Sequence, residues 1–242
     1  MGSTRLPGKT LSEIHGGMHL LECVVRRFRL AGSIADVAVA TTTETKDDPI
    51  AQWCNTNSVS VFRGAENDVL ARVAGAATHF GADAIVQMGA DSAYLDYQLV
   101  DRLTAIYREG GHDYVCNDLK LTFPIGIYAH VVSVPRLIEL SRRTDLTLKD
   151  RENVVTYFWQ HPEHYRLHNI EATPEFHYPE LRLTVDYAED IELARSIYRH
   201  FGDHRFTTGD ILGLYRQSPG MFAATIELAK RATTVLPAQH PS

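Results

Sequence analysis

The first ten residues, Met1 to Thr10 (MGSTRLPGKT), contain the residue types best suited to binding an anion. Glycine, proline and hydroxyl residues favour a loop whose backbone N–H groups can face phosphate oxygens, and Arg5 and Lys9 add positive charge. The loop is not a Walker A motif, because five residues separate Gly2 from Gly8 and a proline stiffens the turn. The composition predicts a triphosphate-binding loop, with an unstructured N-terminus as the alternative.

Two aspartates follow strand-like segments elsewhere in the chain. Asp91 comes after residues 84–88, and Asp186 comes after residues 182–185. If both strands are central and parallel, both carboxylates lie at the edge where α/β folds bind ligands, and they suit Mg²⁺ beside phosphate oxygens. The structural alternatives stay open: Asp91 can close an Asx turn, and Asp186 with Glu189 resembles a helix capping box.

Histidine pairs offer a weaker case for a metal site. His164 and His168 span a change from helix to strand, and Gly202 separates His200 from His204, so neither pair shares a helix face. We therefore expect no zinc site from either pair. The chain also has no Gly-x-Ser-x-Gly motif, which argues against a serine nucleophile on an α/β-hydrolase turn.

Composition limits the class of protein. The 242 residues are 44% hydrophobic, enough for one sizeable domain, and the net charge of −6 argues against binding to nucleic acid or membrane surfaces. Three scattered cysteines, Cys23, Cys54 and Cys116, suit a reducing compartment better than a disulfide framework. No segment resembles a transmembrane helix or a signal peptide, so the sequence predicts a soluble cytoplasmic protein.

Hydrophobic periodicity predicts the elements that position these residues. Strands are expected at 37–41, 59–62, 84–88, 114–117, 124–134, 166–170 and 182–185. Helices are expected at 20–30, 47–57, 69–80, 136–143, 152–160, 187–201 and 210–215. One more helix is expected to begin after the capping residue Asp96 and to end at Gly110, and the tail from Thr233 is expected to be frayed. Alternation of strand and helix predicts an α/β fold with a mainly parallel sheet. The apolar stripe of residues 154–159 is interpreted as core, with a subunit contact as the alternative.

These motifs, in this order, resemble the spore-coat polysaccharide biosynthesis cytidylyltransferases, relatives of the enzymes that make CMP-sialic acid and CMP-Kdo. The matching stretches cover nearly the whole chain: Met1–Lys9, Val39–Thr43, Val61–Gly64, Asp68–Leu70, Arg151–Glu152, Asn169–Glu171, Leu183–Asp186 and Glu189–Asp190. The resemblance implies a glycosyltransferase-A-like, three-layer nucleotide-binding fold with a mixed, mainly parallel sheet. It also implies transfer of CMP from CTP to an acidic sugar or similar small anionic acceptor, with release of pyrophosphate.

The resemblance also assigns roles by position. Gly2, Ser3, Arg5 and Lys9 would hold the phosphates, and Thr41, Thr42, Thr43 and Arg63 would line the cytidine side. Asp91 and Asp186 would hold Mg²⁺, and Arg5, Lys9 and Asp91 would be the catalytic residues. Residues 1–242 would form one nucleotidyltransferase domain with a nucleotide-binding half (1–120), an acceptor and dimer lobe (121–205) and a helical tail (206–242). A homodimer is expected.

Three departures from the family pattern bear on activity. The family's first strand precedes the phosphate loop, and here Met1 is the loop's own methionine, so the sheet is expected to lack that strand. Relatives carry Thr-Gly-Asp-Cys-Pro-Leu where this chain has residues 89–94. Ile125, Tyr128 and His130 stand where relatives carry three acids. The alternatives are a nucleotide-binding or regulatory protein with impaired catalysis, and a cytidylyltransferase for a phosphate or phosphonate acceptor.

Overall fold

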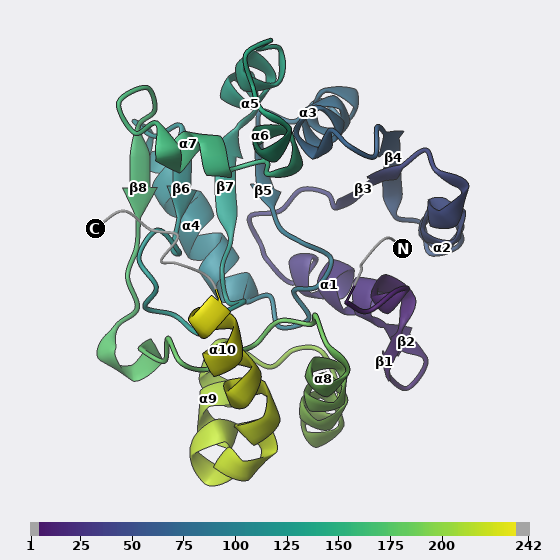
Figure 1. Cartoon of the computed structure of the whole chain (residues 1–242), viewed down its shortest axis with the longest axis vertical. Helices are drawn as coiled ribbons and strands as arrows, with labels where there is room; N and C mark the ends of the chain where they lie inside the picture. Colours follow the sequence, from purple (N-terminus) through teal and green to yellow (C-terminus); the bar gives the residue numbers. More distant parts are fainter. Residues whose placement is uncertain (1–4, 236–242) are drawn as a thin grey trace.

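The computed structural model describes residues 5–235 (Figure 1). Its strands are β1 (Glu13–His15), β2 (Met18–His19), β3 (Ala38–Thr42), β4 (Ser60–Gly64), β5 (Ala84–Gln87), β6 (Tyr114–Cys116), β7 (His130–Ser133) and β8 (Leu167–Asn169). Its α-helices are α1 (Leu20–Phe28), α2 (Asp48–Thr56), α3 (Val69–His79), α4 (Tyr97–Glu109), α5 (Val134–Ser141), α6 (Leu148–Glu152), α7 (Thr156–Gln160), α8 (Ala188–Phe201), α9 (Thr208–Gln217) and α10 (Ala223–Val235). Short 3₁₀ helices cover Lys9–Leu11, Thr45–Asp47, Pro174–Phe176 and Pro219–Phe222.

The main sheet has four strands in the order β5-β7-β6-β8. Strand β7 is antiparallel to both of its neighbours, whereas β6 and β8 are parallel. Strands β3 and β4 form a separate parallel pair, and β1 and β2 form a hairpin that the sequence did not predict. Within residues 5–235, one edge of β3 and one edge of β5 carry no strand partner. The absence of the family's first strand stays a prediction.

Alternating side chains of the main sheet enter two hydrophobic cores, one on each face. Tyr114 and Val132 pack with residues of α3, α5 and α7. Val115 and Val131 belong to the larger core, which contains Leu99 and other residues of α4. Because strand residues alternate between faces, burial on both faces places helices above and below the sheet. The predicted α/β three-layer arrangement with a mixed sheet is confirmed.

Helix ends follow local signals. Asp96 caps α4, since its Oδ1 accepts hydrogen bonds from the backbone N–H groups of Gln98 at 2.9 Å and Leu99 at 3.2 Å. The helix ends at Gly110, whose φ is +90°, as predicted. These caps satisfy N–H groups that have no partner within the helix. No helix within the described part of the chain is long and apolar enough to cross a membrane.

The predicted strands at 124–134 and 182–185 are wrong in extent. Only His130–Ser133 forms strand β7, and the two segments otherwise meet at a single bridge between Ile125 and Arg182. The reason lies at Gly126, whose φ is +94° and where a Cβ atom would lie 2.2 Å from the Leu183 carbonyl oxygen. Residue 126 must be glycine where the two segments cross, and the chain must turn tightly before β7 begins. Neither requirement can be predicted from strand propensity.

The predicted helix at 152–160 is wrong in its first half, because Glu152 is the last residue of α6, residues 153–155 are not helical, and only α7 (156–160) is helical as predicted. Thr147 caps α6, and Asn153 takes an extended conformation that ends it. Val154 and Phe158, from the predicted apolar stripe, are 4% and 0% exposed in the core, which confirms the core interpretation for these two residues. Neither side chain is available for a subunit contact. The homodimer and the division of the chain at residues 120 and 205 stay predictions.

Candidate active site

The Lys9 ammonium group joins the two predicted metal-binding aspartates. Its Nζ lies 3.0 Å from Asp91 Oδ2 and 3.0 Å from Asp186 Oδ1, and it donates to the Val185 carbonyl oxygen at 2.7 Å. The Lys9 and Asp186 side chains are 12% and 11% exposed, and that of Asp91 is 28% exposed. Two carboxylates from distant parts of the chain therefore converge on one cation at a partly solvent-accessible position.

Two arginines extend this cluster. Arg5 NH2 lies 2.9 Å from Asp186 Oδ1, and Arg182 NH2 lies 2.8 Å from Asp186 Oδ2. Arg182 also contacts the buried Asp190 carboxylate at 3.1 Å. The Arg5 guanidinium lies over the Tyr187 ring, 5.3 Å from its centroid. Cations thus contact both carboxylate oxygens of Asp186. Arg182 forms ion pairs with Asp186 and with Asp190 at the same time.

Backbone contacts hold the two aspartates together. Asp91 follows β5, and its carbonyl oxygen accepts a hydrogen bond from Val185 N at 3.1 Å. At Gly89 a Cβ atom would lie 2.4 Å from Asp91 Oδ1, so the carboxylate packs against the Gly89 backbone. Asp186 precedes α8, and the Asp190 carboxylate accepts from the N–H groups of Asp186 at 2.8 Å and Tyr187 at 3.0 Å. The capping acid is therefore Asp190, and the predicted capping box of Asp186 with Glu189 is wrong.

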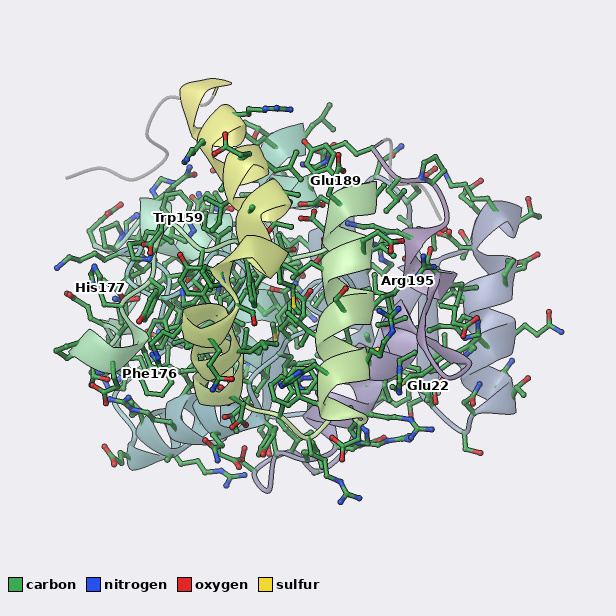
Figure 2. All side chains as sticks on the ribbon, turned by 90° about the horizontal axis from the view of Figure 1, so that it is seen from below. Glu22, Trp159, Phe176, His177, Glu189 and Arg195 are labelled. Carbon is green, nitrogen blue, oxygen red and sulfur yellow. The ribbon has the colours of Figure 1, made fainter. Side chains whose placement is uncertain are left out.

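The segment that follows Lys9 packs against the helix that follows Asp186. Hairpin β1–β2 contacts α8, and Arg195 of α8 donates to the Glu13 carbonyl oxygen at 3.1 Å. Figure 2 shows α8 with Glu189 near its start and Arg195 directed toward the hairpin. Gly8 has a φ of +77°, a conformation that glycine adopts readily, and it leads into the 3₁₀ helix that begins at Lys9. These contacts fix the base of the predicted phosphate loop.

The charges around Asp186 keep it ionised. Burial alone would raise the pKa of Asp186, but hydrogen bonds from Lys9 and Arg182 and the positive charge of Arg5 outweigh burial and lower it. Next to Asp91, burial raises the pKa of the Tyr128 phenol to about 12, and the Asp91 charge adds to the effect. The site therefore places an ionised carboxylate, Asp186, and a protonated phenol, Tyr128, near Asp91 at neutral pH.

The donor atoms fit a divalent cation. Asp91 and Asp186 each direct a carboxylate oxygen to the same point, and the cation now at that point is the Lys9 ammonium. Carboxylate oxygens are hard ligands, which suit Mg²⁺ better than soft metals. The absence of a side chain at Gly89 leaves room for the Asp91 carboxylate in this orientation.

The predicted cytidine-binding residues form a second cluster at the carboxyl end of the β3–β4 pair. Thr42 Oγ1 donates to Asp47 Oδ2 at 2.5 Å, and Arg63 Nε donates to the Thr42 carbonyl oxygen at 2.8 Å. Arg63 also forms an ion pair with Asp48 at 2.7 Å. Thr41 and Thr42 are buried. Hydrogen bonds and an ion pair within this cluster hold the side chains of Thr42 and Arg63 in place. The predicted phosphate-binding residues Gly2 and Ser3 lie outside the described residues.

Several residues near this site were not predicted. Arg182 and Asp190 stand four residues on either side of Asp186, a spacing that could have marked them. Tyr128 stacks on the buried His130, whose Nε2 lies 2.8 Å from Asp118 Oδ2. Burial raises the pKa of Asp118, but the charge and hydrogen bond of His130 outweigh it and lower the value. No sequence spacing indicates the contact between Asp118 and His130, because it depends on how β6 and β7 pair.

Comparison with known proteins gives the family and the fold of the chain. Residues 1–208 match the cytidylyltransferase family. The chain is 31% identical over 224 residues to the spore coat polysaccharide biosynthesis protein SpsF of Bacillus subtilis, covering 90% of this chain and 92% of that protein. A cytidylyltransferase structure from Leptospira borgpetersenii superposes with a TM-score of 0.85 at 28% identity, covering 92% of each chain. A CMP:2-keto-3-deoxy-manno-octonic acid synthetase complexed with CTP shares the fold, with a TM-score of 0.62 at 15% identity over 83% of this chain and 95% of that one.

Proposed function

The chain belongs to the cytidylyltransferase family and is a CTP-dependent nucleotidyltransferase, and we propose that it transfers CMP to a small anionic acceptor, an acidic sugar, with release of pyrophosphate. One observation supports this proposal above the others: Lys9, Asp91 and Asp186 converge from three distant segments. Cations and carboxylates at one point suit phosphoryl chemistry, in which charge on the leaving pyrophosphate must be neutralised.

The roles of the residues follow from their contacts. The Arg5 side chain is 52% exposed and can exchange Asp186 for phosphate oxygens. Lys9 would exchange its ion pairs with Asp91 and Asp186 for phosphate oxygens in the same way. Gly2 and Ser3 would add backbone N–H groups to the same loop. Thr41 to Thr43 and Arg63 would line the cytidine side. Arg182 would orient the Asp186 carboxylate through its hydrogen bond to Oδ2, the oxygen that Lys9 does not contact.

Cytidylyltransferases of this type generally use a divalent metal ion, and we propose that Asp91 and Asp186 hold Mg²⁺ here. When bound, the ion would neutralise charge on the phosphate oxygens and help to orient them. The acceptor oxygen would attack the α-phosphorus directly, with the bond to pyrophosphate breaking as the new P–O bond forms. A nucleotidyl-enzyme trapped on the way to product would contradict this route.

The test is pyrophosphate release from CTP with Mg²⁺ and a panel of acidic sugars, run beside ATP, GTP and UTP. We expect release only with CTP and an acceptor. Asp91→Asn keeps the shape of the side chain and removes its charge, so turnover should be lost while the thermal unfolding temperature changes little. The matched control is Asp36→Asn, since the exposed Asp36 accepts hydrogen bonds from Val37 N and Ser60 Oγ, which lie outside the cluster. Full turnover in the Asp91→Asn variant would contradict the assignment.

A further inference from the structure

The turn between α7 and β8 brings two imidazoles and a carboxylate together. His161 Nδ1 lies 3.3 Å from Glu163 Oε1, and His164 Nε2 lies 3.4 Å from the same oxygen. One ligand atom from each of the three residues lies within 4.8 Å of the other two. We propose that His161, Glu163 and His164 bind Zn²⁺ with three protein ligands and one open coordination position.

The distances support zinc on geometric grounds. Zinc binds nitrogen and oxygen at about 2.0–2.1 Å, so neighbouring ligands of a tetrahedral ion lie roughly 3.3–3.4 Å apart. Both histidine–glutamate separations match this spacing before any metal is present. Side-chain rotation would complete the site: the His164 side chain is 59% exposed, and that of His161 is 37% exposed beside the Tyr157 ring.

The backbone already holds the three residues in one turn. His164 N donates to the His161 carbonyl oxygen at 3.0 Å, and Pro162 restricts φ between them. The Tyr157 ring lies 4.1 Å from the His161 ring, centroid to centroid, and limits its orientation. Because the turn forms without a metal, less ordering is needed on binding than in a flexible segment.

The proposed zinc site is separate from the candidate active site. Strand β8 and strand β5, which leads to Asp91, lie at opposite ends of the main sheet (Figure 1). The cysteines, which would compete for zinc as thiolates, are all buried in the structure. The sequence pairs His164 with His168, but the His168 ring instead contacts His112, at 4.9 Å between centroids. The pairing with His168 selects the wrong histidine, because the ligands of the proposed site lie within the four residues 161–164.

The experiment is titration of the full chain with ZnCl₂, without nucleotide, followed by calorimetry. His161→Gln and His164→Gln should each weaken zinc binding at least about tenfold. Mutating a residue that only hydrogen-bonds a metal ligand typically weakens metal binding about 10- to 100-fold, so losing a ligand itself should cost at least the lower figure. His112→Gln is the matched control, since this histidine also contacts a second imidazole, that of His168, but is not part of the metal-ligand cluster found among the described residues. The zinc affinity of this variant should equal that of the unchanged chain. Thermal unfolding checks that each variant is folded.

The competing outcome is zinc binding to the carboxylates of the candidate active site, and Asp91→Asn separates the two cases. If the proposal is right, one zinc ion still binds that variant with unchanged affinity, and substitution of Co²⁺ gives visible absorption bands that His161→Gln removes. Zinc binding that depends on Asp91 and is unaffected by both histidine variants would overturn the proposal. So would the absence of zinc binding to the unchanged chain at micromolar concentration.

Discussion

Replacing Lys9 with methionine tests the geometry of the candidate active site most directly. The substitution keeps most of the length of the side chain and removes the cation between Asp91 and Asp186. Each charged hydrogen bond contributes about 1.5–3 kcal/mol, and the exposure of Asp91 reduces its share, so we expect a loss of about 2–4 kcal/mol in unfolding free energy. For a chain of this size that corresponds to roughly 5–15 °C in the unfolding temperature.

The loss should depend on pH in a defined direction. The pKa of Asp186 is lowered in the folded chain, so its contribution to stability is complete above the unfolded pKa of about 3.9 and disappears as pH falls through the lower folded value. Removing Lys9 removes part of that contribution. The difference in unfolding free energy between the original chain and Lys9→Met should therefore be full at neutral pH and shrink below about pH 4.

The same substitution should increase affinity for a metal ion. In the nucleotide-free chain the Lys9 ammonium occupies the point where both carboxylates converge, so it competes with Mg²⁺ for the same oxygens. If removing the competing ammonium makes the free energy of Mg²⁺ binding more favourable by about 1–2 kcal/mol, Mg²⁺ binds roughly 5- to 30-fold more tightly in the absence of CTP. Pyrophosphate release should nevertheless fall, because the phosphates lose a cation.

Calorimetric titration with MgCl₂ and thermal unfolding between pH 3.5 and 8 measure both effects. Lys46→Met is the matched control, because Lys46 pairs with Glu66 at the surface and lies outside the cluster. It should change Mg²⁺ affinity and stability little. If Lys9→Met binds Mg²⁺ no more tightly than the original chain, the metal does not occupy the position between the two carboxylates, and the reasoning fails.

Three further predictions concern stability and the site. Arg27→Met should cost about 2–4 kcal/mol in chemical unfolding, because the fully buried guanidinium donates to three backbone carbonyls; an unchanged midpoint would contradict this. Asp113→Asn should cost about 1–2 kcal/mol at pH 7 and almost nothing near pH 2, because Arg166 lowers the pKa of the buried Asp113 to about 2 against the effect of burial, and the 64% exposure of Arg166 limits the gain. Gly89→Ala should reduce pyrophosphate release with little change in unfolding temperature, because a Cβ atom would displace the Asp91 carboxylate; normal release would show that this orientation is unnecessary.

The sequence predicted elements well where local pattern and burial agree. Strand β5 and the helix capped by Asp96 came from an apolar run and from a capping residue, both of which act within a few positions. The strands at 124–134 and 182–185 failed because their shape depends on each other. Gly126 must adopt a positive φ against Leu183, nearly sixty positions away, and no window of sequence contains that contact.

The same distinction separates the predicted site residues from the missed ones. Lys9, Asp91 and Asp186 could be selected because each stands in a loop with a suitable charge, whereas their convergence is a tertiary fact. Arg182 and Asp190 were missed because they were assigned to a strand and a helix, where a charge is usually solvated. Their burial behind Asp186 makes them part of the site.

The balance of charge in the cluster argues for a divalent cation with the nucleotide. Arg5, Lys9 and Arg182 face three carboxylates, those of Asp91, Asp186 and Asp190, so the cluster is close to neutral before any ligand enters. A triphosphate would then meet carboxylates as well as cations. Asp91 and Asp186 direct carboxylate oxygens at one point, where the Lys9 ammonium lies. If Lys9 turned toward the phosphates, these carboxylates would repel the phosphate oxygens unless another positive charge took its place. We therefore propose that the cluster binds a nucleotide together with a metal ion, and weak CTP binding when divalent ions are chelated is the outcome this proposal requires.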